Sequence, residues 1–240
     1  LPGFANPLLA TGIVPGQHIV NRVRNMVDAE LEVLPGKAIT PLVGYSWNQL
    51  VGPGQTTYTV GQDEFRLGQD LASTEQEFRV GVAFHSGPVS GRIVQGWRKL
   101  SEHETLYLAT GAGPGNNSFS YFDVNPSLTS FQRAGETKMN SPVTNALVRG
   151  ELGPVRLLGS YVRANAGTDS GESEALSGTL ASYGLNRFFK GLTETTSSRA
   201  DLSYWKGSVR AEATILSFAD VTAGYTQRHR VSSEVHTVDR

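Results

Sequence analysis

The stretch from Phe78 to Lys99, FRVGVAFHSGPVSGRIVQGWRK, indicates a β-structure, because hydrophobic residues recur at every second position on both sides of a short turn. The turn itself is Ser86-Gly87-Pro88. A period of two indicates a strand, since successive side chains of a strand point to opposite faces. Two alternating runs joined by Ser-Gly-Pro therefore predict a β-hairpin, each arm of which has one apolar and one polar face.

The same unit occurs three more times along the chain. Further alternating runs flank short turns at Leu34 to Lys37, Leu152 to Pro154 and Leu216 to Asp220, a repeat of roughly 50–65 residues. We expect all four turns on one side of the sheet. The intervals between the hairpins, about 52–73, 101–142 and 163–198, are polar, and we expect them to be long loops on the other side. Short turns opposite long loops are typical of transmembrane barrels, whereas most connections of a soluble sandwich are short.

Composition excludes several classes of protein. The 240 residues suffice for one domain with a sizeable core, and we expect residues 1–240 to form a single β-barrel domain that is the ordered part of a longer chain. The net charge of −1 argues against a nucleic-acid partner. The absence of cysteine excludes disulfides, thiolate metal sites and covalently attached haem. No run is long and apolar enough for a spanning helix.

One face of the predicted strands carries full charges at every second position. Such charges cannot face a dry core without a large desolvation cost, so they must meet bulk water or a hydrated lumen. In a barrel they line the lumen. The predicted lumen-lining residues are Arg79, Arg92, Arg98, Arg149, Arg156, Arg210, Arg228, Asp28, Glu30 and Glu32.

The other face carries small aliphatic residues, with an aromatic ring late in the returning arm of each hairpin. A tilted spanning strand needs about nine to eleven residues, which would place these rings near one lipid–water interface. The predicted interface aromatics are Tyr45, Trp47, Trp97, Tyr161 and Tyr225. The residues expected to point outward with them include Val82, Ile93, Val148, Leu157, Ala211 and Ala223.

Alternation alone leaves two readings of the fold open. In a sandwich the apolar face is core and the charged face is bulk surface, whereas in a barrel the apolar face meets lipid. The loop asymmetry, the small apolar residues and the aromatic positions favour an all-β, antiparallel transmembrane β-barrel. The alternative is a soluble extracellular structural or adhesive β-protein that binds a partner through its long loops.

Three stretches carry a resemblance to a known class: VRGELGPVRLLGSYVRA, VRAEATILSFADVTAGYTQRHR and the opening FRVGVAFHSGPVSGRIVQGWRK. They resemble bacterial outer-membrane β-barrels, whose hairpins end in an aromatic-bearing, Arg-rich strand, and within them the porins that sheath decahaem cytochromes. The resemblance implies a barrel in the bacterial outer membrane, acting as a passive pore or as a sheath around a partner. It also implies a lipid bilayer around the wall, and a multihaem cytochrome or other outer-membrane protein as partner.

Motifs for catalysis or cofactor binding have plainer readings. Asp169-Ser170-Gly171 lacks the flanking residues of the protease motifs that it resembles, and we expect it to be a loop. Gly111 to Gly115 lacks the Lys-Ser/Thr of a phosphate loop, and we expect it to be a loop as well. The five histidines, His18, His85, His103, His229 and His236, have no paired ligand spacing. The sequence therefore predicts no catalytic residue, no metal and no cofactor, and we expect a protein that is not an enzyme.

Overall fold

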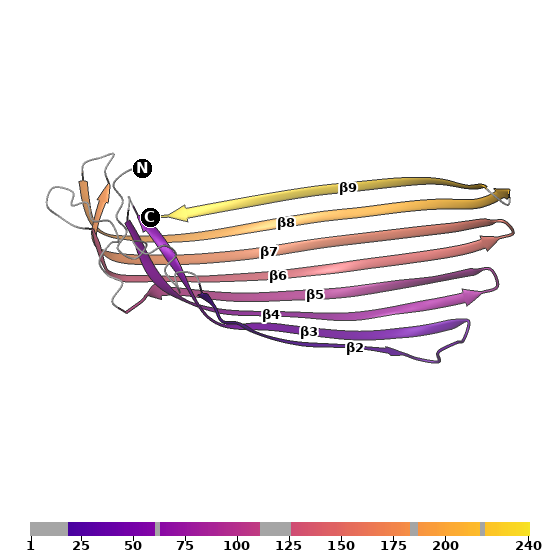
Figure 1. Cartoon of the computed structure of the whole chain (residues 1–240), viewed down its shortest axis with the longest axis horizontal. Helices are drawn as coiled ribbons and strands as arrows, with labels where there is room; N and C mark the ends of the chain where they lie inside the picture. The colour runs from indigo at the N-terminus through magenta and orange to yellow at the C-terminus, as the bar shows by residue number, and fades with distance from the viewer. Residues whose placement is uncertain (1–18, 61–62, 111–125, 183–186, 217–218) are drawn as a thin grey trace.

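The computed structural model describes residues 19–60, 63–110, 126–182, 187–216 and 219–240, and these form one antiparallel β-sheet without a helix. The sheet runs in the order β1-β3-β4-β5-β6-β7-β8-β9, and β2 pairs with β3 beside β1 (Figure 1). The strands are β1 Ile19–Val20, β2 Val23–Glu32, β3 Ile39–Val60, β4 Asp63–Ser86, β5 Val89–Leu108, β6 Ser127–Leu152, β7 Val155–Ser182, β8 Arg187–Leu216 and β9 Ala219–Asp239. The predicted all-β antiparallel fold is confirmed. The described sheet is open, with β2 and β9 at opposite edges, as an ordered part of a barrel is.

The four hairpin turns lie where alternation predicts them, and all lie at the same end of the sheet (Figure 1). Gly87 and Gly153 each begin a two-residue connection and have positive φ angles of 55° and 60°. Gly followed by Pro suits such turns, because glycine tolerates a positive φ and proline cannot donate to the next strand. The turn between β2 and β3 has positive φ at Leu34 and Gly36. Residues 217–218 of the last turn lie outside the described residues.

The intervals 52–73, 101–142 and 163–198 are mostly strand, so the prediction of long loops is wrong for their described parts. Polar residues form strands here because the neighbouring strands satisfy the backbone and polar side chains also pair across them. Thr137 Oγ1 lies 3.1 Å from Ser170 Oγ, and Ser203 donates to Asn165 at 2.9 Å. Asp169-Ser170-Gly171 is accordingly part of β7 and not a loop. Gly111 to Gly115 lies outside the described residues.

The strands are far longer than a bilayer requires. β8 has 30 residues and β7 has 28, against about nine to eleven for a tilted spanning strand. At about 3.3 Å per residue, β8 extends for roughly 100 Å. Strands of this length are about three times as long as one such crossing needs.

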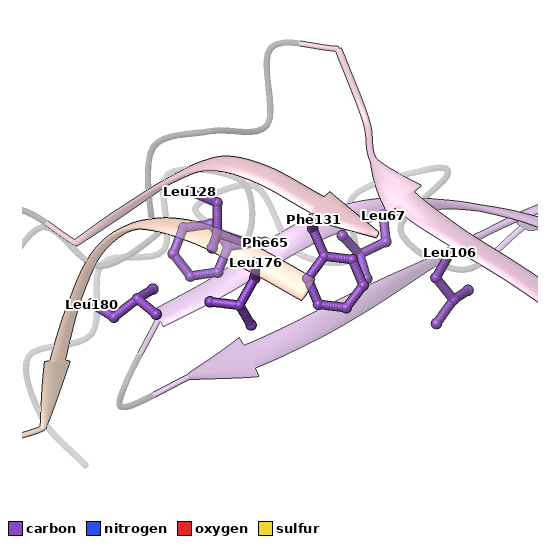
Figure 2. Packing of buried hydrophobic residues seen from close by; sticks show 7 residues of the cluster. All are labelled: Phe65, Leu67, Leu106, Leu128, Phe131, Leu176 and Leu180. Carbon is purple, nitrogen blue, oxygen red and sulfur yellow. The ribbon is translucent and has the colours of Figure 1, made fainter. Parts of the chain in front are cut away.

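The buried core lies at the end opposite the turns, where Figure 1 shows the sheet curling. Figure 2 shows its seven side chains, which come from β4, β5, β6 and β7. They are Phe65, Leu67, Leu106, Leu128, Phe131, Leu176 and Leu180. Strand alternation puts Leu67 on the same face as Arg79, and Leu106 on the same face as Arg98. The curled end therefore buries the face that carries the charges.

Candidate functional site

The strand register places all ten predicted lumen residues on one face of the sheet, here called the charged face. Cα partners on neighbouring strands point to the same side, and so do residues two apart along a strand. Arg156, for example, is the partner of both Glu151 and Glu212, and Arg98 is the partner of Glu77. That this face lines a lumen stays a prediction.

Arginines of β4 and β5 reach carboxylates on the edge strand β2. Arg92 donates from one Nη to both carboxylate oxygens of Glu30, at 2.8 and 2.7 Å, and Arg79 pairs with Asp28. Strands lie about 4.8 Å apart, so β2 and β5 are separated by roughly 14 Å of sheet. Two side chains can bridge that span where the sheet curves toward them, which makes the charged face the concave one here.

Glycines on the charged face leave room for these arginines. A Cβ on Gly44 would lie 2.9 Å from Nε of Arg79, and a Cβ on Gly96 would lie 2.6 Å from Oε1 of Glu77. Gly44 and Gly96 are the Cα partners of Arg79 on either side. The guanidinium of Arg79 therefore lies across backbone that only glycine leaves uncovered.

The β6–β9 half of the charged face has a second group of ion pairs. Arg149 binds Glu151 at 2.5 Å, and Arg156 lies 3.6 Å from Glu212 and 3.9 Å from Glu151. Arg210 lies 3.0 Å from Glu212. Three arginines thus share two carboxylates. An open pocket of about 440 Å³ lies at the turn end of this half, between Glu151, Arg156, Glu212 and the β9 residues Asp220 and Thr222.

Not every predicted lumen residue is paired. Glu32 and Arg228 make no ion pair with any residue that the structure describes, although both lie on the charged face. Arg98 lies 3.2 Å from Glu75 and from Glu77. Sequence reasoning missed Glu75, Glu77 and Lys206 as members of this face. Their position in the alternation, in phase with Arg79 and Arg210, was the signal that places them there.

The opposite face is apolar near the turns, and nothing in the described chain covers it. Many of its large hydrophobic side chains are solvent-exposed, including Ile93 at 44% and Val209 at 58%. All five predicted aromatics lie on this face: Tyr45, Trp47, Trp97, Tyr161 and Tyr225. Two more rings that sequence reasoning missed extend the group: Phe78 stacks on Trp97 with centroids 6.1 Å apart, and Trp205 stacks on His229 at 6.5 Å.

These rings form a band that runs obliquely across the strands. The row of successive Cα partners that serves as a reference is Gln95, Thr144, Arg163, Trp205 and His229. Trp97 lies two residues from this reference row, on the side away from the turns. Tyr45 lies in the same row as Trp97, because Phe78 is the Cα partner of both. Tyr161 lies two residues toward the turns and Tyr225 four. From Tyr45 on β3 to Tyr225 on β9 the shift is six residues over six strand-to-strand steps, whereas Trp47 lies two residues farther from the turns than Tyr45 and Trp205 lies on the reference row.

A shift of one residue per strand is the stagger of a barrel whose strands tilt by about 36°. At that tilt the oblique band becomes a ring in one plane. On β5 the apolar segment from Val89 to Trp97 measures about 26 Å along the strand and about 21 Å along the axis of such a barrel. Beyond Trp97 the same face continues with Lys99, Ser101 and His103. The apolar zone thus ends at the aromatic band.

At the curled end, a polar group borders the buried core. The Tyr58 hydroxyl donates to Glu174 Oε1 at 3.3 Å, and Arg133 Nε donates to Glu174 Oε2 at 2.7 Å. Burial, and then the charge of Glu174, raise the pKa of Tyr58 to about 12. Burial, the largest single effect, lowers the pKa of Arg133, but its hydrogen bond to Glu174 and the charges of Glu174, Glu172 and Tyr58 together outweigh burial and raise the pKa above its usual value. The three groups hold β3, β6 and β7 together around the core.

Among the described residues, no group of three His, Asp or Glu side chains is placed to hold a metal ion. No helix of the described chain is long and apolar enough to cross a membrane. No protein-family model matches the chain, and no curated protein matches its sequence. The contrast between the charged face and the apolar face is therefore the structural feature that bears on function.

Proposed function

We propose that this chain forms part of the wall of a bacterial outer-membrane β-barrel, which acts as a passive pore or as a sheath around a partner. The observation that carries the proposal is the division of the turn-side sheet into two faces. One face is apolar and ends in an oblique aromatic band, and the other is concave and carries arginine–carboxylate pairs. Transmembrane barrels combine an apolar outer band about 25 Å tall, aromatic girdles and a polar interior.

Energetics favour the charged face as the wet one. An arginine facing lipid at mid-bilayer costs roughly 2–4 kcal/mol, and Arg92, Arg149, Arg156 and Arg210 lie on the same face of the sheet. Turning that face to lipid would therefore cost on the order of ten kcal/mol. The apolar face, with Val209 and Ile93 exposed, loses nothing by meeting acyl chains.

The soluble alternative needs a cover for the apolar face. In a sandwich, residues such as Val82, Ile93 and Ala211 would pack against a second sheet. The described residues form one sheet, and their buried hydrophobic cluster lies at the curled end on the charged face. A lipid bilayer is the cover that the exposed apolar band fits. The edges at β2 and β9 require further strand pairing in lipid, because unsatisfied backbone groups are costly there.

A sheath requires a partner protein on the concave side of the sheet. A charged concave face that is hydrated suits a protein partner held by polar contacts, and a multihaem cytochrome or another outer-membrane protein is the partner we propose. The chemistry on this face is passive, because ion pairs between arginine and carboxylate hold a surface but do not activate a substrate. We accordingly propose no enzymatic activity.

Detergent extraction followed by gel migration tests the proposal. The full-length protein should require detergent for solubility and should migrate differently before and after boiling, because a hydrogen-bonded barrel wall resists unfolding in the unheated sample. Reconstitution into vesicles should then give protease protection of the turn-side zone. A protein that stays monomeric and soluble without detergent contradicts the proposal and favours the soluble β-protein.

A further inference from the structure

The charged face is electrically divided between its two halves. On β2 to β5, Arg79, Arg92 and Arg98 all have carboxylate partners, whereas Arg24, Glu32 and Glu102 have no ion pair among the described residues. On β6 to β9, three arginines share Glu151 and Glu212. Between the turns and the row of Glu234, that second half carries three more cations without an ion pair among the described residues, Lys206, Arg228 and Arg230. Asp220 and Glu234 of β9 also lie on this face, so six cations stand there against four carboxylates. Positive charge is therefore in surplus on one side of the concave face.

These three cations, here called the basic patch, lie close together. Lys206 and Arg228 are Cα partners on β8 and β9, so their Cβ atoms lie about 5 Å apart. Arg230 follows Arg228 by two residues on the same face, about 7 Å along the strand. Two like charges directly opposite each other destabilise a sheet. The strand register places Lys206 and Arg228 opposite each other in this way.

The surroundings of the basic patch do not relieve the repulsion. Lys206 faces Val162 across to β7, and Arg230 faces Tyr204, whose next partner is Ala164. No carboxylate stands in these rows on β7 or β8. All three cationic side chains are exposed. An anion placed between them would remove the unfavourable contact and accept charge-assisted hydrogen bonds from all three.

We propose that the basic patch binds small polyanions of the phosphate type and gives the wall a preference for anionic solutes. Guanidinium groups donate in a fixed fork that matches phosphate oxygens, and a lysine ammonium adds a point charge. The inference rests on the proposed pore function for the passage of solutes. Binding itself requires only that the charged face is accessible to water.

Binding of inorganic tripolyphosphate to the detergent-solubilised full-length protein tests the site directly by calorimetric titration. The double variant Lys206→Gln/Arg228→Gln should bind at least about tenfold more weakly, because it lacks two of the three cationic donors. The matched control is Lys99→Gln/Arg163→Gln, which removes a lysine and an arginine from the opposite face. The control should bind as the unaltered protein does.

Equal binding by the two double variants, or no measurable binding by the unaltered protein, overturns the inference. The folded state of each variant is checked by heat-dependent gel migration. If the double variant does not fold, Lys206→Gln and Arg230→Gln are titrated singly, and each should weaken binding. The affinity of the unaltered protein should also fall as potassium chloride is added, because the attraction is screened.

Planar bilayers separate this inference from the proposed function. Under a potassium chloride gradient, the unaltered protein should show a reversal potential displaced toward that of chloride, and Lys206→Gln/Arg228→Gln should move it toward that of potassium. A silent bilayer with intact tripolyphosphate binding contradicts the pore but supports the anion site. Conductance without anion preference, together with absent binding, leaves the pore standing and overturns the anion site.

Discussion

Arg92 on β5 binds Glu30 on β2 across two intervening strands, with Nη–Oε distances of 2.8 and 2.7 Å. The contact ties an edge strand, whose residues are all exposed, to the interior of the sheet. It also identifies the side toward which the sheet bends. The charged residues therefore have two effects: they make one face hydrophilic, and they hold the β2–β3 hairpin bent toward that face.

Removing either partner of this pair should lower stability modestly. Both side chains are partly exposed, at 42% for Arg92 and 33% for Glu30, so screening limits the coupling to about 0.5–1 kcal/mol. A double-mutant cycle of Arg92→Gln and Glu30→Gln, measured by urea unfolding, should give a coupling of that size. The same cycle with Lys99→Gln in place of Arg92→Gln should give none, because Lys99 lies on the other face.

Gly44→Ala should destabilise the fold although alanine is usually the better residue in a strand. The added Cβ would meet Nε of Arg79 at 2.9 Å, so the Arg79 side chain must shift from its place across Gly44, which weakens its contact with Asp28. We expect a loss of about 1 kcal/mol in the free energy of unfolding. Gly135→Ala is the matched control, since a Cβ there has its nearest neighbour at 4.0 Å. That variant should be neutral or slightly more stable, and equal effects at the two glycines would refute the packing argument.

Phe65→Ala should be the most damaging change at the curled end. Phe65 is fully buried in the core cluster, and truncating a buried phenylalanine costs about 3–5 kcal/mol. Phe189→Ala removes the same ring from a position that is 43% exposed and should cost far less. Unfolding curves in urea measure both. A similar loss at the two positions would show that the cluster of Figure 2 does not stabilise this end.

The curled end should also loosen at high pH through Tyr58. Its pKa is about 12 in the folded protein against an ordinary value of 10.0. Because the folded value is the higher one, the contribution of Tyr58 is complete below pH 10 and disappears as the pH rises from about 10 to about 12. Tyr58→Phe, which lacks the ionisable hydroxyl, should lose less stability over that range. Parallel alkaline unfolding curves for the two proteins would contradict the assignment.

Ala211→Arg should impair insertion into bilayers. Ala211 lies on the apolar face opposite Leu157 and Ala223, and an arginine facing lipid there would cost about 2–4 kcal/mol. Thr222→Arg places the same side chain on the charged face, where its Cα partner is Glu212, and should insert normally. The inserted fraction is measured by flotation of vesicles. Insertion of both variants to the same extent would count against a lipid-facing apolar side.

The alternation in the sequence predicted the turns and the two faces because pleating alone fixes them. It did not predict that polar intervals form strand, since residues such as Thr137 and Ser170 become strand residues only when a neighbouring strand supplies partners. It placed Glu30 and Arg92 on one face but not in contact, because their distance depends on the curvature of the sheet. Phe65 and Leu67 lie in an interval expected to be loop, so the core they build was missed.

Labelling of single cysteines on adjacent residues distinguishes a face in lipid from a face in water, and the chain has no cysteine of its own to interfere. Arg210→Cys and Ala211→Cys differ by one position and lie on opposite faces of β8. In reconstituted vesicles, a charged, water-soluble maleimide should label Cys introduced at position 210 and not at position 211, whereas a lipid-soluble maleimide should label the second. Rapid labelling of both by the water-soluble reagent would contradict a barrel wall with one face in lipid.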